Sequence, residues 1–152
     1  MALPNLSRDY RELLLLFAKH RVRYLVVGAY AVNRYTEPRY TKDIDLWIDR
    51  SLKNAQRAYR ALAEYGAPLG DFTSKDFMDR NIVFQIGIEP VRVDVLTSIA
   101  GVRFETAWAN KTSTMVGGMR IHFISKPDLI KAKKAAGRKQ DLIDLDALEG
   151  KS

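Results

Sequence analysis

Apolar residues recur along the chain with the two periods that distinguish helices from strands. After Ser7, a residue type that caps helices, apolar positions follow helical spacing to about His20. The same spacing, with its start and stop signals, predicts further helices at about 29–34, 51–65, 103–110, 126–137 and 140–148, and a turn of helix near 75–78. Alternating or short continuous apolar runs predict strands at about 24–28, 43–48, 82–86, 91–96, 112–116 and 120–124. We expect the last four strands to form two hairpins.

The order of these elements predicts the fold class. Helices and strands interleave, which is typical of an α/β or α+β protein with a mixed β-sheet flanked by helices. Residues 24–27 are all apolar and precede Gly28, so we expect a central strand covered on both faces. The chain has no internal repeat and no linker rich in Pro or Gly, and its 152 residues suit a single domain spanning 1–152.

Composition excludes several classes of protein. The chain has no cysteine, which excludes a disulfide framework, a zinc–thiolate site and a thiol nucleophile. Its longest purely apolar run, residues 13–18, is far shorter than the roughly 20 residues of a membrane span. The N-terminus has no signal-peptide pattern, so we expect a cytoplasmic protein. The net charge of +7 favours polyanionic partners such as nucleotides or nucleic acid, although solubility explains it equally well.

The most informative pattern is a pair of acids within the strand predicted at 43–48. Side chains alternate along a strand, so Asp43 and Asp45 share one face while the apolar residues between them share the other. Asp94 occupies the corresponding face of the strand predicted at 91–96. If the two strands are neighbours, three carboxylates converge and can hold two divalent cations about 4 Å apart, as in phosphoryl or nucleotidyl transfer. Oxygen ligands favour Mg²⁺ or Mn²⁺. The alternative is that these acids merely face solvent.

Gly28 lies where the strand at 24–28 passes into a helix. The first backbone N–H groups of a helix lack intrahelical partners and form a natural phosphate site. A glycine there lets a phosphate approach the backbone closely. An ordinary tight turn explains a single glycine equally well.

Together these features resemble the polymerase-beta-type nucleotidyltransferase superfamily. The resemblance rests on Val26-Val27-Gly28-Ala29, on Arg39, Thr41, Asp43 and Asp45 at alternate positions, and on Asp94 in a later strand. The blocks 39–46, 87–99, 101–108 and 129–144 are similar to the small prokaryotic branch related to the abortive-infection, toxin-type enzymes. These blocks extend from about Tyr24 to Leu148 and cover most of the chain.

The resemblance implies a nucleotidyltransferase fold, with a mixed sheet, flanking helices and C-terminal helices. It implies that Asp43 and Asp45 bind two metal ions, while Asp94 binds the catalytic one and helps to deprotonate the acceptor hydroxyl. Gly28 and the amides after it would hold the β- and γ-phosphates, and the Thr41 hydroxyl would also reach a phosphate. Ala29 departs from the Gly-Gly or Gly-Ser motif. It keeps the N–H group and adds a methyl group, so we expect weakened nucleotide binding.

The predicted helix at 126–137 and the residues just after it are strongly basic, with six cationic side chains against one acid between 126 and 139. By the resemblance, Lys133 would neutralise triphosphate charge, with Arg138 and Asp141 as a supporting pair. The alternative is a solvated helix face with weak ion pairs. In the loop before the acid pair, Arg39 and Lys42 would contact the nucleotide or an RNA acceptor, or would only balance the acids.

We therefore predict a Mg²⁺-dependent nucleotidyltransferase that moves NMP from an NTP to a hydroxyl of a tRNA, a protein or a small molecule. The resemblance also suggests a toxin with an antitoxin partner. One alternative is a catalytically degenerate protein of the same fold that binds nucleotide or nucleic acid. Another is a nucleic-acid-binding module that uses residues 131–139. Trp47 falls on the face of the acid pair, where it would pack or stack on a base.

Overall fold

The computed structural model describes residues 7–37, 41, 43–87 and 91–150. The elements in chain order are α1 (Arg8–Lys19), β1 (Tyr24–Val27), α2 (Gly28–Tyr35), β2 (Asp43–Ile48), α3 (Leu52–Tyr65), the 3₁₀ helix η1 (Ser74–Met78), β3 (Val83–Ile86), β4 (Arg92–Leu96), α4 (Phe104–Asn110), β5 (Thr112–Val116), β6 (Met119–Phe123), α5 (Lys126–Ala136) and α6 (Lys139–Leu148). Every element predicted from the sequence is present within one or two residues of its expected bounds.

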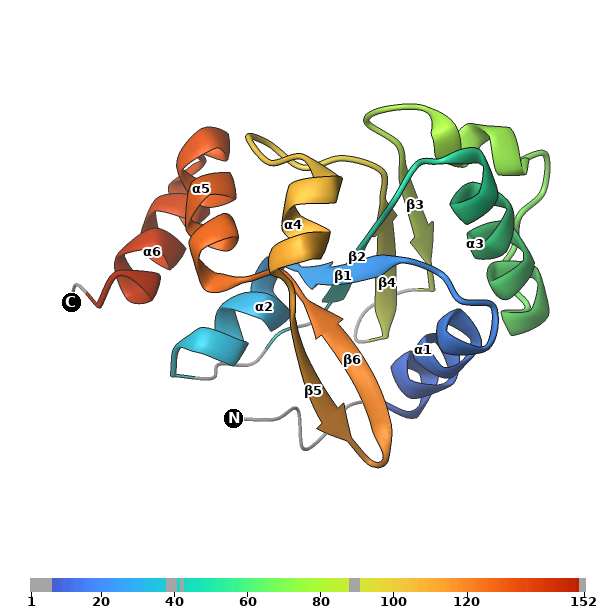
Figure 1. Ribbon diagram of the computed structural model, residues 1–152, viewed down its shortest axis with the longest axis horizontal. Coiled ribbons are helices and arrows are strands. Elements are labelled where there is room, and N and C mark those ends of the chain that lie inside the picture. Colours follow the sequence, from blue (N-terminus) through green and yellow to red (C-terminus); the bar gives the residue numbers. More distant parts are fainter. Residues whose placement is uncertain (1–6, 38–40, 42, 88–90, 151–152) are drawn as a thin grey trace.

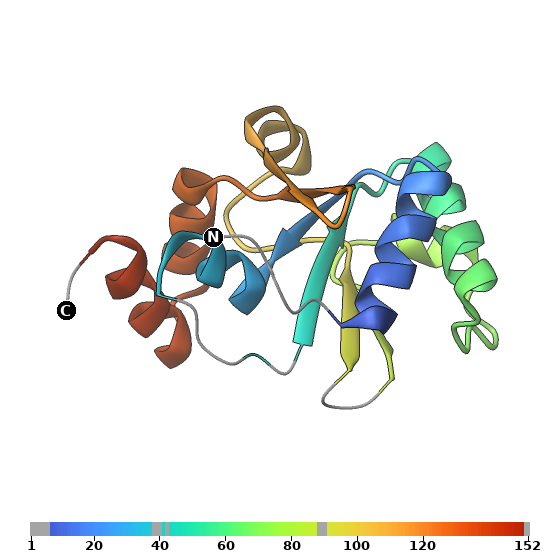
Figure 2. The same cartoon turned by 90° about the horizontal axis from the view of Figure 1, so that it is seen from below.

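The strands form one six-stranded mixed sheet in the order β3-β4-β2-β1-β6-β5. β2 pairs with β4, and β1 with β6, in parallel, whereas the β1–β2, β3–β4 and β5–β6 pairs are antiparallel. The connection between β3 and β4 lies partly outside the described residues. Figure 1 shows α5 and α6 on one side of the sheet and α1 and α3 on the other, and Figure 2 shows the same division from below. The predicted class, a mixed sheet flanked by helices, is confirmed.

The helix ends follow from local capping. The hydroxyls of Ser7, Ser51 and Ser125 each accept a hydrogen bond from a backbone N–H in the first turn of the helix that follows. Gly66 ends α3 in the left-handed conformation, with φ 90°. These residues lie at or next to the predicted ends of their helices, and capping involves only residues within one helical turn, which is why the sequence alone locates those ends.

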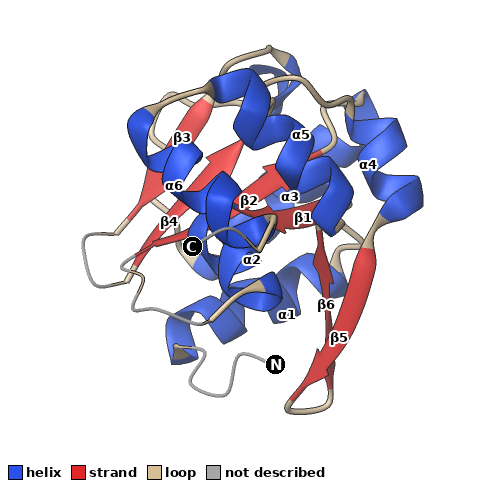
Figure 3. Cartoon of the chain, turned by 90° about the vertical axis from the view of Figure 1, so that its left-hand side faces the viewer, coloured by secondary structure: helices blue, strands red, loops and turns tan. Residues whose placement is uncertain are grey.

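The core lies on both sides of the middle strands. All four residues of β1 are buried, as predicted for a central strand. On one side, α2, α5 and α6 lie in front of the strands in Figure 3. Trp47 is only 2% exposed and packs edge-on against Phe104 of α4, with ring centroids 5.1 Å apart. Of the two roles that the sequence allowed for Trp47, packing is the one observed, because α4 covers that part of the sheet and leaves the ring too buried to stack on a base. Within the described residues, no helix combines the length and apolarity that a bilayer crossing requires.

Candidate active site

A cleft of about 440 Å³ opens where β1 ends and α2 begins. Its walls come from the end of β1, the start of α2, strands β2, β3 and β4, the segment 98–100, α5 and the start of α6. It is lined by Val27, Gly28, Asp45, Val83, Asp94, Leu96, Ser98, Ile99, Ala100, Leu129, Ala132, Lys133, Ala136, Arg138 and Asp141. The fold thus brings six of the residues predicted from sequence into one cavity.

Asp45 and Asp94 lie side by side in this cleft. β2 and β4 run parallel, and their register places Asp45 opposite Asp94. Burial is the largest cause, and the negative charges of Asp94 and Asp43 add to it; together they raise the pKa of Asp45 to about 7. Asp94 is 7% exposed, and its Oδ1 is buried without a hydrogen-bond partner among the described residues. Two crowded carboxylates with an unsatisfied buried oxygen form a donor set that fits a hard divalent cation.

Asp43 lies two residues before Asp45 on β2 and contacts Arg92, a residue whose role was not predicted from the sequence. Arg92 Nη2 lies 2.8 Å from Asp43 Oδ2 and 3.3 Å from Asp94 Oδ2, so its guanidinium bridges these two carboxylates. The register explains this contact, because Arg92 is the residue of β4 that faces Asp43. Over the described ranges, no group of three or more acids or histidines is arranged to hold a metal ion. The three aspartates share one face as expected, but Asp43 is paired with the cation of this protein's own Arg92.

The Asp45 carboxylate lies against Gly28 and requires that this position has no side chain. Its φ is +69°, a left-handed conformation that favours glycine. A Cβ built on Gly28 would overlap Asp45 Oδ2 and lie 3.0 Å from Asp45 Cγ. The sequence suggested that the missing side chain gives room for a phosphate. In the structure, the Asp45 carboxylate occupies that room.

Four further residues before β2 were predicted to lie near the nucleotide: Ala29, Arg39, Thr41 and Lys42. Ala29 follows Gly28 in the first turn of α2, and Thr41 lies two residues before β2; both are half-buried. Among described residues, the cleft wall includes neither of them. Arg39 and Lys42 lie outside the described residues.

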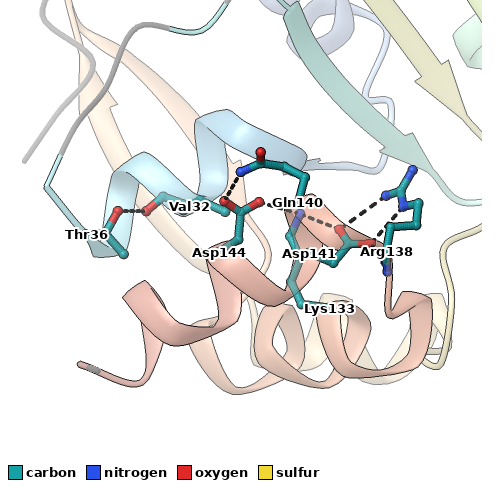
Figure 4. A network of polar contacts seen from close by, with 7 residues as sticks. All are labelled: Val32, Thr36, Lys133, Arg138, Gln140, Asp141 and Asp144. Atoms are coloured by element: carbon teal, nitrogen blue, oxygen red, sulfur yellow. Dashed lines mark hydrogen bonds and ion pairs between the residues drawn. The ribbon is translucent and has the colours of Figure 1, made fainter. Parts of the chain in front are cut away.

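Lys133 is held in the cleft wall by two carboxylates of α6 (Figure 4). Its Nζ lies 3.1 Å from Asp141 Oδ1 and 3.0 Å from Asp144 Oδ2. The predicted pair of Arg138 and Asp141 is present, since Arg138 Nε donates to Asp141 Oδ2 at 2.7 Å. Gln140 Nε2 donates to Asp144 Oδ1 at 3.0 Å. Asp144 lies three residues after Asp141, on the same face of the helix, and its part in this network was not predicted from the sequence.

Asp141 is the centre of this network. Its carboxylate is about 2% exposed. Burial raises the pKa of Asp141, but hydrogen bonds from Arg138 and Lys133 outweigh burial and lower the pKa to about 2. Asp141 is therefore ionised near neutral pH, and Lys133 has a fixed position opposite the aspartates of the sheet. A ligand in the cleft would lie between carboxylates on one wall and cations on the other, which suits a phosphate chain that binds with a divalent cation.

Comparison with known families decides what kind of protein has this cleft. A family described as nucleotidyl transferase of unknown function (DUF2204) matches residues 6–151. The chain belongs to this family. Nucleotidyl transferases move a nucleoside monophosphate from an NTP and generally use a divalent metal, so the family supports an enzyme of this reaction class. No curated protein sequence matches the chain significantly.

Two solved structures share the fold of this nucleotidyl transferase. One is assigned as a candidate nucleotidyltransferase from Thermotoga maritima. It is 18% identical, with a TM-score of 0.65, over 99% of this chain and 96% of the other. The second is the lincosamide antibiotic adenylyltransferase LnuA in a lincomycin-bound crystal structure. It is 17% identical, with a TM-score of 0.59, over 96% of this chain and 98% of the other. Together with the family match, this shared fold confirms the resemblance to nucleotidyltransferases seen in the sequence, whereas the likeness to the toxin-type branch stays a prediction.

Proposed function

We propose that this chain is a single nucleotidyltransferase domain, spanning 1–152, that uses Mg²⁺ to transfer NMP from an NTP to an acceptor hydroxyl. One observation carries the proposal: Asp45 and Asp94 are adjacent on parallel strands and face Lys133 and Arg138 across one cleft. Two crowded acids opposite fixed cations suit a metal-bound triphosphate better than they suit a purely structural role.

The carboxylates would hold the metal. Asp45 and Asp94 form the proposed ligand pair, and Asp43 joins them for a second ion when Arg92 turns away. Bound Mg²⁺, or Mn²⁺, supplies charge stabilisation to the phosphates and the entering oxygen. The backbone N–H groups of Gly28 and Ala29 and the hydroxyl of Thr41 are proposed to contact the β- and γ-phosphates, and Arg39 and Lys42 to contact the nucleotide or acceptor.

The proposed chemistry is a single in-line displacement. Asp94 accepts the proton of the acceptor hydroxyl, and the oxygen forms a bond to the α-phosphorus. The bond from that phosphorus to the bridging oxygen of the β-phosphate breaks, and pyrophosphate leaves. Lys133 and Arg138 balance the charge that develops on pyrophosphate. Asp141 and Asp144 act by keeping Lys133 in place.

The acceptor is proposed to be a tRNA end, a protein side chain or a small molecule. The fold shared with a lincosamide adenylyltransferase supports a small-molecule hydroxyl as one candidate. The resemblance to toxin-type enzymes supports a nucleic-acid or protein acceptor and an antitoxin partner. We propose that the protein acts in the cytoplasm.

Melting temperatures with each of the four NTPs, with and without Mg²⁺, test the site. Ligand at 100 times its Kd should stabilise the wild type by about 2.7 kcal/mol, and this stabilisation should require Mg²⁺. Asp45→Asn should abolish it. Asp146→Asn, which removes an exposed carboxylate on α6, should retain it. An equal Mg²⁺-dependent shift in Asp45→Asn would reject the proposed metal site.

A catalytically degenerate protein of the same fold is the second candidate. Ala29 replaces the usual second Gly or Ser, and Arg92 occupies the space between Asp43 and Asp94. Incubation with α-labelled NTPs and separate RNA, protein and metabolite fractions distinguishes the two. Label transfer that is lost in Asp45→Asn supports the enzyme. An NTP-dependent melting shift with no transfer to any fraction supports the degenerate protein.

A further inference from the structure

A second cleft, of about 590 Å³, lies at the other end of β1. The first cleft includes Val27, and the second includes Tyr24, about 10 Å away along the strand. Its apolar part comes from α1, the α1–β1 connection and β6. Its full lining is Leu15, Ala18, Arg21, Val22, Arg23, Tyr24, Arg57, Trp108, Gly118, Met119, Arg120 and His122. We call it the arginine cleft, because four arginines from three segments line it: two from the α1–β1 connection, one from α3 and one from β6.

The charges of the arginine cleft are not neutralised. In the part of the chain that the structure describes, no carboxylate forms an ion pair with Arg21, Arg57 or Arg120. Arg23 has only a contact of 3.8 Å with Glu105, and both side chains are exposed. The arginine cleft therefore presents cationic groups that can be used for a ligand.

The basic helix α5, which the sequence made the obvious polyanion site, is different. Lys133 pairs with Asp141 and Asp144, Arg138 pairs with Asp141, and Lys134 Nζ lies 3.5 Å from an oxygen of Glu149. α6 thus neutralises much of the charge of α5. In the arginine cleft, by contrast, three of the four arginines form no ion pair with a described carboxylate.

The ring of Trp108 lies next to two cations at the edge of the cleft. Lys111 Nζ lies 4.1 Å from the centroid of the Trp108 ring, and Arg23 Cζ lies 5.5 Å from it. His122 packs edge-on against Trp108 at 5.4 Å. Burial lowers the pKa of His122, and the charges of Lys111 and Arg120 lower it further. Trp108 therefore holds cations in place at the edge of the cleft.

Arg21 has a backbone conformation that glycine usually supplies. After α1, the N–H of Val22 donates to Phe17 O at 2.8 Å and that of Arg21 to Ala18 O at 3.1 Å, which is a Schellman ending. α3 ends in the same way with Gly66, at φ 90°, whereas Arg21 has φ 57°. A left-handed non-glycine residue costs stability. Arg21 is therefore a position where glycine would fit the backbone better, which makes Arg21→Gly a test of what the side chain does at the cleft.

We propose that the arginine cleft binds backbone phosphates of a single-stranded nucleic acid. Guanidinium groups match phosphate oxygens in paired hydrogen bonds, and four of them spread around one cleft suit successive phosphates better than a single anion. The apolar floor of Leu15, Ala18 and Met119 suits a ribose or a base. This site is separate from the carboxylate cleft and does not depend on nucleotidyl transfer.

The test is fluorescence anisotropy with a labelled single-stranded RNA of about 12 nucleotides, in EDTA, so that no metal-dependent binding contributes. Salt is varied between about 50 and 200 mM. The variant is Arg57→Ala/Arg120→Ala. The matched control, Lys126→Ala/Lys131→Ala, removes the same charge from exposed positions of α5. The arginine variant should bind at least about tenfold more weakly at the higher salt, and its slope of log K against log salt should fall by about 1.4. The control should stay close to the wild type.

A second variant guards against misfolding as an explanation. Arg21→Gly should raise the melting temperature, because glycine fits the left-handed position, and should still weaken RNA binding. Equal losses in the arginine and lysine variants would overturn the proposal in favour of a general charge effect. Binding of inorganic pyrophosphate without any binding of RNA would also overturn it. Neither of these outcomes bears on the NTP experiment, because that experiment tests the other cleft, which Asp45 and Asp94 line.

Discussion

Asp45 and Gly28 depend on each other at the scale of single residues. Antiparallel pairing of β1 with β2 places Asp45 opposite Val27, immediately before Gly28. The carboxylate of Asp45 fills the space in which any other residue at position 28 would place its Cβ. One glycine therefore serves two purposes: it permits the turn from β1 into α2, and it lets Asp45 reach the cleft.

Gly28→Ala should reduce both stability and Mg²⁺-dependent NTP binding. The left-handed backbone alone costs about 1–2 kcal/mol, and displacement of Asp45 adds to that cost. Gly118→Ala is the matched control, because Gly118 has φ 81° and nothing within 4 Å of a built Cβ. Urea unfolding of both variants measures the difference. If the two variants lose the same stability and bind NTP equally, the overlap with Asp45 has no energetic role.

The helices α5 and α6 act as a unit at the scale of elements. α5 supplies Lys133 to the cleft, and α6 supplies the two buried acids that fix it. A buried carboxylate is tolerated only with such partners. The network therefore explains why an acidic segment follows a basic one in the sequence.

The lowered pKa of Asp141 makes the stability of the folded protein depend on pH. Its pKa is lowered in the folded protein, to about 2. It therefore contributes stability above the ordinary pKa of an aspartate, about 4, and loses that contribution as pH falls from about 4 to about 2. Asp141→Asn should lower the free energy of unfolding at pH 7 by about 1–3 kcal/mol and reduce the loss of stability in that acid window.

Thermal unfolding between about pH 2 and pH 7 checks this, with Asp146→Asn as an exposed control on the same helix. If Asp141→Asn and the wild type lose the same amount of stability between about pH 4 and pH 2, the pairing of Asp141 with Lys133 and Arg138 contributes no stability.

The charge of the whole molecule is divided between two clefts. Acids and paired cations line the carboxylate cleft at the end of β1, and arginines line the arginine cleft at the start of β1. The net charge of +7 therefore describes neither cleft. Because the two share no lining residue, effects on one should add to effects on the other.

Arg57→Ala/Arg120→Ala should leave the Mg²⁺-dependent NTP melting shift within error of the wild type. Asp45→Asn should leave RNA binding in EDTA unchanged. Melting shifts and anisotropy on the same four proteins, with the combined variant as the fourth, measure this independence. A reduced NTP shift in the arginine variant would mean that the two clefts are coupled.

The sequence by itself determined the local features of this protein. Ser51 and Gly66 mark the two ends of α3, because capping involves only residues within one helical turn. Strand alternation placed Asp43 and Asp45 on one face for the same reason. The grouping of these acids with Gly28 and Asp94 was sufficient to indicate the nucleotidyltransferase superfamily.

Only the tertiary structure decided which side chains meet. The register of β2 against β4 aligned Asp45 with Asp94 and brought Arg92 between Asp43 and Asp94. The packing of α6 on α5 paired Lys133 and Lys134 with carboxylates, while Arg21, Arg57 and Arg120, far apart in the chain, came together in a second cleft. Register and packing depend on contacts between distant segments, and the periodicity of a single segment carries no information about them.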